Sequence, residues 1–118
     1  MLRFAVATFV AISLWGVAHA QELSAEVDKT LWCGSAFFWL GSNALDSGAI
    51  IEAKEYDEAS NYLMNRSVEL LKLDGLDTAA IEHVMDAYDN AVVAELGTAD
   101  ARHDVTTCLE LIPKRQPR

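Results

Sequence analysis

Residues 31–41 read LWCGSAFFWLG and form the stretch with the most aromatic side chains in the chain. Ser24 is a favourable N-cap residue, and a helix is predicted from there to about Leu45. The apolar residues of the stretch cover more than one face of that helix. Either the helix lies at the centre of the fold and is covered on several sides, or part of it forms a surface for a partner. In the second case the expected contact residues are Trp32, Phe37, Phe38 and Trp39.

The two cysteines of the chain, Cys33 and Cys108, are predicted to form a disulfide. Cys33 lies in the predicted first helix and Cys108 in the predicted last one, at similar distances from the helix starts. A bridge between them would close a loop of about 75 residues, which the chain-entropy model associates with about 4.5 kcal/mol of stabilisation. Free thiols or an intermolecular bridge are the alternatives.

Residues 1–20 have the pattern of a cleavable secretory signal. Arg3 precedes an apolar stretch, and small residues lead up to a cleavage point after Ala20. The alternative is a retained N-terminal anchor. Residues 21–113 then form one helical domain, and residues 114–118 form a short basic tail. We therefore expect a protein of the bacterial periplasm or a secreted protein, with no membrane span in its mature form.

Helical periodicity continues through the rest of the chain, and no strand alternation is recognised. Turn signals near residues 46–48, 74–76 and 97–98 divide this region, and Pro113 ends the last helix. The predicted helices are 24–45, 49–73, 77–96 and 98–112. Because the connections are short, neighbouring helices are expected to be antiparallel. The predicted fold is all-α: a small four-helix up-and-down bundle closed by one disulfide.

Acidic residues outnumber basic ones: the chain has 18 Asp and Glu, 9 Lys and Arg, and a net charge of −9. Removal of residues 1–20 takes away one cation and no carboxylate, and three of the remaining cations lie in the last five positions. The helical domain is therefore strongly acidic. Such a surface repels phosphates and anionic lipid headgroups, so we expect neither nucleic-acid binding nor membrane-surface binding. Solubility alone explains the charge, and a cationic protein partner is the functional alternative.

Residues suited to catalysis or metal binding occur without a recognisable motif. His83 and Asp86 are three positions apart, and Glu82, Asp86 and Asp89 form a row of carboxylates on the predicted third helix. A solvated acidic helix gives the same pattern, and neither a zinc-protease motif nor a nucleophile elbow is present in the sequence. We therefore predict no catalytic residue, no metal ligand and no cofactor. A metal-binding protein or an enzyme is the alternative.

Taken together, these features resemble the small acid-stress chaperones of the bacterial periplasm, the HdeA/HdeB type. The shared features are a signal peptide, fewer than a hundred mature residues, helices only and one cysteine pair, with Trp32-Cys33 as a local similarity. In that family further helix follows the second cysteine, whereas Cys108 lies near the end of this chain. The resemblance implies an acid-activated chaperone, because acid would neutralise the 18 carboxylates and invert the net charge. No functional residue is transferred from the family.

These observations predict a small non-enzymatic protein that acts outside the cytoplasm by binding another protein through the aromatic residues of its first helix. The sequence does not identify this protein partner or client; a cationic protein and a second copy of this chain are the candidates it suggests. Two alternatives use the same aromatic residues or the same charge: an acid-activated periplasmic chaperone, and an inhibitor of a cationic enzyme.

Overall fold

The computed structural model describes residues 23–114, and every regular element in this range is helical. Three long helices are followed by two short ones: α2 (Ala25–Asp46), α3 (Ile50–Leu73), α4 (Thr78–Glu95), α5 (Val105–Cys108) and the 3₁₀ helix η1 (Leu109–Leu111). The all-α class is therefore confirmed for the described range. The predicted signal segment 1–20 and positions 115–118 of the predicted tail lie outside it.

Two of the three long helices begin at the capping residue that the sequence predicts. The Ser24 hydroxyl accepts a hydrogen bond of 3.2 Å from the backbone N–H of Val27, and the Asp77 carboxylate accepts one of 2.9 Å from Ala80. α3 ends where Gly75 takes a left-handed conformation with φ of 91°, which glycine adopts without strain. Capping and turn residues thus explain why the bounds of these helices agree closely with the prediction.

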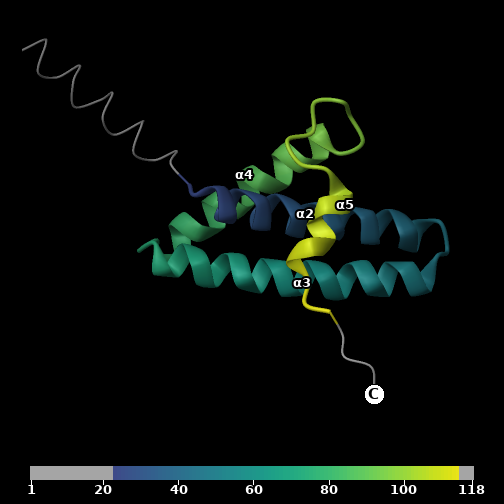
Figure 1. The fold of residues 1–118 in the computed structure, drawn as a ribbon, viewed down its shortest axis with the longest axis horizontal. Helices are drawn as coiled ribbons and strands as arrows, with labels where there is room; N and C mark the ends of the chain where they lie inside the picture. The colour runs from purple at the N-terminus through teal and green to yellow at the C-terminus, as the bar shows by residue number, and fades with distance from the viewer. Residues whose placement is uncertain (1–22, 115–118) are drawn as a thin grey trace, which may run out of the picture.

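α2 occupies the centre of the fold and is covered on several sides. Figure 1 shows α2 and α3 side by side as an antiparallel hairpin, with α4 crossing obliquely. Residues 105–114, here called the C-terminal segment, cross both helices of the hairpin (Figure 1). α2 contacts α3, α4 and α5, whereas α3 and α4 meet mainly near the turn that joins them. Most of α2 is therefore a central helix covered by other parts of the fold, which is the first of the two interpretations of the aromatic stretch.

Small residues let α2 and α3 approach closely. A Cβ atom added to Gly34 would lie 2.7 Å from the Met64 sulfur, so a larger residue there requires Met64 to move. The buried Ser60 hydroxyl donates a hydrogen bond of 2.8 Å to the backbone oxygen of Gly34, which satisfies both polar groups inside the interface. A Cβ added to Gly41 would lie 3.2 Å from the Cβ of Tyr56. The helix that these two glycines admit is thus the chain's own α3.

The predicted disulfide is confirmed. Cys33 of α2 and Cys108 of α5 are bonded, with their Cα atoms 5.5 Å apart, and both are fully buried. They belong to a core cluster around the middle of α2: Trp32, Cys33, Ala36, Phe37, Leu63, Val92 and Cys108. The bridge therefore anchors the C-terminal segment to the middle of the central helix.

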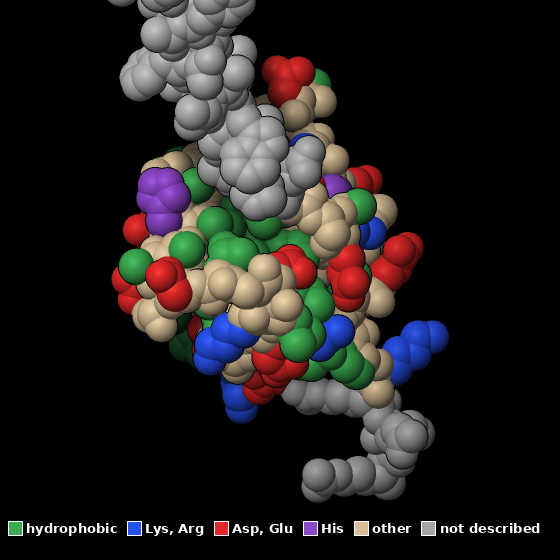
Figure 2. Space-filling view, turned by 90° about the vertical axis from the view of Figure 1, so that its left-hand side faces the viewer, with side chains coloured by type: hydrophobic (Ala, Val, Ile, Leu, Met, Phe, Trp, Pro, Cys, Tyr) green, Lys and Arg blue, Asp and Glu red, His purple; other side chains and the backbone are tan. Residues whose placement is uncertain are grey.

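A second core cluster lies at the end of the molecule where α3 turns into α4. It contains Val27, Leu31, Leu71 and Ile81. Figure 2 views the molecule from this end and shows hydrophobic side chains near the middle of the face, with acidic and basic side chains around them. This end of the hairpin is therefore closed by packing between α2, α3 and α4.

The predicted fourth helix, 98–112, is only partly present. Residues 97–104 form a loop, and the α-helical part of the segment is the single turn of α5. α5 crosses α2 and α3 instead of running along them (Figure 1). The all-helical, disulfide-closed fold is therefore confirmed, whereas the up-and-down arrangement of four helices is not.

Hydrogen bonds outside the helix explain the loop. The Arg102 guanidinium and backbone N–H both donate to the Glu95 carboxylate near the end of α4. Asp104 then accepts a hydrogen bond of 2.9 Å from the backbone N–H of Thr106 and acts as the N-cap of α5. These contacts outweigh helix propensity, which differs by less than about 1 kcal/mol among ordinary residues.

Candidate protein-binding surfaces

The structure separates the four aromatic residues that the sequence proposes as one contact surface. Trp32 and Phe37 are buried, at 0% and 1% exposure. Trp39 is half-buried, and its indole N–H donates a hydrogen bond of 2.9 Å to Asp89 of α4. Phe38 is 51% exposed. In the folded chain a partner can therefore reach Phe38 directly, but not Trp32 or Phe37.

Phe38 belongs to an apolar hollow near the turn of the α2–α3 hairpin. The hollow has a volume of about 470 Å³ and is lined by eight residues: Phe38, Gly41, Ser42, Leu45, Ile50, Ala53, Lys54 and Asp57. Neither α4 nor residues 97–114 contribute to its lining. Its two charged residues have opposite signs. We call these eight residues the hairpin-end surface.

A second apolar depression lies between α3 and the C-terminal segment. It consists of two adjoining hollows of about 330 Å³ and about 520 Å³, which share Glu55 and Leu109. Its apolar and aromatic lining residues are Phe37, Tyr56, Ala59, Tyr62, Val105, Leu109, Ile112 and Pro113. Its charged lining residues are three exposed carboxylates of α3: Glu52, Glu55 and Glu58. We call this depression the acidic groove.

The loop that precedes α5 is held against α2 by a polar cluster centred on Asp28. One oxygen of Asp28 accepts hydrogen bonds from the Tyr88 hydroxyl at 2.6 Å and from the Arg102 guanidinium at 3.2 Å. The other oxygen lies 2.8 Å from Nε2 of His103. Arg102 also forms a two-pronged contact with Glu95, at 3.0 Å and 2.8 Å. The Asp28 cluster thus joins α2, α4 and the loop.

The hydrogen bonds of the Asp28 cluster favour the charged carboxylates. Partial burial alone would raise the pKa of Asp28, but hydrogen bonds from Tyr88, His103 and Arg102 outweigh it and hold this pKa below its ordinary value of 3.8. Hydrogen bonds from Arg102 also lower the pKa of Glu95. Burial and the hydrogen bond to Asp28 raise the pKa of Tyr88. At neutral pH both carboxylates are therefore charged while the tyrosine keeps its proton.

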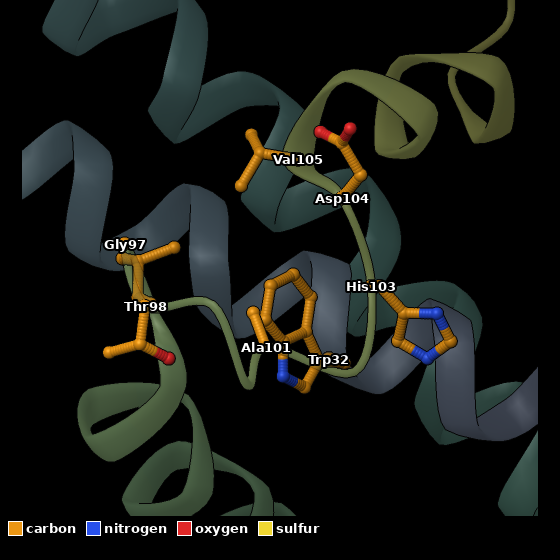
Figure 3. Close-up of a pocket in the computed structure, with 8 residues that line it drawn as sticks. Trp32, Gly97, Thr98, Ala101, His103, Asp104 and Val105 are labelled. Carbon is orange, nitrogen blue, oxygen red and sulfur yellow. The ribbon is translucent and has the colours of Figure 1, made fainter.

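The same loop covers a cavity of about 330 Å³ beside Trp32. Figure 3 shows the indole beneath the loop, with Thr98 on one side and His103 on the other. The rings of Trp32 and His103 meet edge-on, with centroids 5.6 Å apart. The buried indole N–H has no acceptor in hydrogen-bond geometry within residues 23–114. The indole still helps to lower the pKa of Glu95, by less than Arg102 does. Trp32 therefore supports the loop, and its role in partner contact stays a prediction.

The residues considered as metal ligands do not converge. Glu82, His83 and Asp86 are exposed on α4, while Asp89 accepts hydrogen bonds from two residues of α2. Within the described range, no group of three or more His, Cys, Asp or Glu residues is placed to hold a metal ion. The carboxylate row of the sequence is therefore divided between solvent and the α2–α4 contact.

The sequence pattern gives an incomplete signal for each surface. Leu45 is an apolar residue near the end of the predicted first helix, but it is exposed in the structure. Among the elements of residues 23–114, only α3 lies beside the last turns of α2 (Figure 1). The acidic groove brings α3 together with residues 105–113, and periodicity carries no information about that contact. The predicted bridge does indicate that contact, because it brings Cys108 to the middle of α2, close to Phe37.

Comparisons with protein-family models, with curated proteins and with solved structures find no match for this chain. Within residues 23–114, no helix combines the length and the apolar character needed to cross a membrane. Functional proposals therefore rest on the geometry and charge of the two surfaces.

Proposed function

We propose that this chain is a small non-enzymatic protein-binding domain that works outside the cytoplasm, in the periplasm or as a secreted protein. The buried disulfide and the signal-like pattern of residues 1–20 support this compartment. The proposal of protein binding depends on one observation. Three large apolar side chains of the hairpin-end surface are more than half exposed and line the same hollow: Phe38, Leu45 and Ile50. Grouped exposed apolar residues are typical of interaction sites.

The partner that fits the hairpin-end surface is an apolar segment of another protein with little net charge. Gly41 and Ala53 are small, so the hollow between the larger side chains can accept an apolar side chain of the partner. Contact there removes apolar surface from water, which releases about 25 cal/mol per Å². The charges of Lys54 and Asp57 cancel, so the residues that line this hollow carry no net charge of their own.

A photoreactive phenylalanine analogue at position 38 tests this proposal. In cells that export the protein, irradiation is expected to join it to one discrete protein, identified by its mass and peptides. The matched control is the same analogue at position 73, because Leu73 is 80% exposed at the far end of α3 and lines neither surface. Ile50→Ser alters one exposed side chain of the hollow and is expected to reduce the cross-linked product several-fold.

Two outcomes of this experiment would contradict the proposal: equal products from positions 38 and 73, or a yield that Ile50→Ser leaves unchanged. A product with twice the mass of the chain would identify the occupant of the hairpin-end surface as a second copy.

A second candidate function, an acid-activated chaperone, is favoured by the Asp28 cluster. The cluster holds the loop over Trp32, and protonation of Asp28 would weaken the hydrogen bonds that depend on its charge. Buried aromatic residues would then become accessible to unfolded proteins. Tryptophan fluorescence and apolar-dye binding between pH 7 and pH 2 test this function. We expect exposed tryptophan and bound dye at pH 2, and an unchanged compact protein would rule this function out.

A further inference from the structure

We propose that the acidic groove is a docking site for a basic amphipathic helix of a partner protein. None of the residues that line the acidic groove belongs to the hairpin-end surface. The two sites are therefore distinct, and this inference does not depend on the function proposed above.

The acidic groove offers apolar surface that the described part of the chain does not cover. Leu109 is 61% exposed and Tyr62 is 43% exposed, and both line the depression. Residues between positions 52 and 62 of α3 form one wall, which corresponds to about 15 Å at 1.5 Å per residue. The opposite wall comes from α5 and the residues after it. A groove of this length accommodates nearly three turns of a partner helix.

The charges of the acidic groove select a cationic partner. Glu52, Glu55 and Glu58 follow one another at intervals of three, about 4.5 Å apart along the helix axis. No Lys or Arg within the described range lines either hollow. Glu52 and Glu55 also take part in none of the ion pairs formed among residues 23–114. These two carboxylates are therefore available to cations of a partner.

A helix with Lys or Arg at every third or fourth position beside an apolar stripe matches this arrangement. The apolar stripe would contact Leu109 and Tyr62, in the manner of a helix bound in a groove. The aliphatic stems of Lys or Arg would lie along the edge, with the charged groups beside Glu52 and Glu55. The ring of Tyr62 provides a further favourable contact for a cation. A second copy fits less well, because it would bring the same carboxylates.

A synthetic leucine–lysine peptide, with leucine at positions i, i+3, i+4 and i+7, is the probe for this site. A leucine–glutamate peptide with the same leucine pattern is the control peptide. Measured by fluorescence anisotropy at low salt, the oxidised protein is expected to bind the lysine peptide and not the glutamate peptide. Added salt is expected to weaken the binding, because the charges on both partners are exposed.

Matched charge variants locate the binding. Glu52→Gln combined with Glu55→Gln is expected to weaken lysine-peptide binding about fivefold to tenfold, through the loss of two surface charge pairs. Glu82→Gln combined with Asp86→Asn removes the same charge from the exposed face of α4. Both double variants are compared at about 0.15 M salt, where the Debye length is about 8 Å. The α4 control is expected to leave the affinity within about twofold there, because screening limits the reach of distant surface charges.

The apolar part of the site is tested separately by Leu109→Ser, which is expected to weaken lysine-peptide binding several-fold. Leu73→Ser is its control, and thermal unfolding by circular dichroism shows whether each variant is folded. The proposal is overturned if the α4 charge variant weakens binding as much as the groove variant, because overall charge then explains the attraction. It is also overturned if deletion of residues 114–118 strengthens binding about tenfold or more, because the groove then belongs to the chain's own basic tail.

Discussion

The hairpin-end surface and the acidic groove are both apolar depressions along α3, but they differ in the charges around the apolar residues. The hairpin-end surface has one lysine and one aspartate, whereas the acidic groove has three carboxylates and no cation within the described range. Buried apolar area determines how much free energy a contact can release, while charge determines which partner approaches. Under the two proposals above, one small domain would distinguish two classes of protein segment.

The two surfaces also differ in the parts of the chain that form them. The hairpin-end surface needs only α2 and α3, which are consecutive in the sequence. The acidic groove needs residues 105–113, which the Cys33–Cys108 bridge and the Asp28 cluster hold in place. Perturbing the C-terminal segment should therefore affect the acidic groove and spare the hairpin-end surface.

Removal of the disulfide is expected to have the largest effect. The bridge spans 75 residues, and the chain-entropy model assigns such a bridge about 4.5 kcal/mol. Domains of this size have a free energy of unfolding of only about 5–15 kcal/mol. We therefore expect Cys33→Ala combined with Cys108→Ala to lower the Tm strongly in circular dichroism and to abolish lysine-peptide binding. Cross-linking from position 38 is expected to persist at temperatures where α2 and α3 remain folded.

Unchanged affinity of the folded double-alanine variant for the lysine peptide would contradict this difference between the two surfaces. In that case the acidic groove would not depend on the bridge, and the Asp28 cluster alone would position the C-terminal segment.

Acid is expected to weaken the same side of the molecule. Because the folded state lowers the pKa of Asp28, its contribution to stability is present above the ordinary value of 3.8 and is lost as the pH falls below it. The lowered pKa of Glu95 acts in the same direction below its ordinary value of 4.5. Denaturant unfolding between pH 7 and pH 2 is therefore expected to show falling stability, with most of this loss below about pH 4.5.

Asp28→Asn separates this cluster from general acid effects. The variant keeps the size of the side chain but loses charge-assisted hydrogen bonds, so we expect a loss of about 2 kcal/mol at pH 7. Its further loss on acidification should be smaller than that of the unmodified chain. Asp100→Asn, at an exposed loop position, is the control, with an expected change below about 0.5 kcal/mol. Parallel pH profiles for Asp28→Asn and the unmodified chain would contradict this role of Asp28.

The local parts of the fold could be predicted from the sequence because they depend on neighbouring residues. Ser24 and Asp77 start helices by accepting hydrogen bonds from backbone N–H groups three positions later. The path of residues 97–104 could not be predicted in this way. It depends on contacts such as Arg102 with Asp28, 74 positions apart, which compete with a local pattern that favours helix. The disulfide is the exception, because a single pair of cysteines that follows a signal-like segment predicts a long-range contact directly.

The candidate site could be predicted only in part for a related reason. Periodicity shows that residues 31–41 are apolar around the helix, but it does not show which faces other helices cover. α4 covers Trp39 through Asp89, and nothing in the described range covers Phe38 to the same extent. Of the four aromatic residues, the exposed one is therefore decided by which faces of α2 are covered by α3, α4 and residues 97–113, and not by its neighbours in the sequence.

Gly41→Ala is expected to have the smallest effect on stability, because two changes of similar size oppose each other. Alanine favours the helix over glycine by about 1 kcal/mol. The new Cβ would lie 3.2 Å from the Cβ of Tyr56 and 3.5 Å from the backbone oxygen of Ala53, so α3 must move slightly. Such overpacking costs about 1 kcal/mol or more. We therefore expect the Tm to change by no more than about 3 °C.

The same variant shows whether the two surfaces are independent. Gly41 lines the hairpin-end surface, while Tyr56 lines the acidic groove and stacks on Phe37 with ring centroids 5.9 Å apart. A displacement of Tyr56 should therefore change lysine-peptide affinity together with the cross-linking yield from position 38. Asn43→Ala, at an exposed position of α2, is the control for a general change in helix stability. If only the cross-linking yield changes, the movement caused at Gly41 does not alter the acidic groove, and the two surfaces are independent.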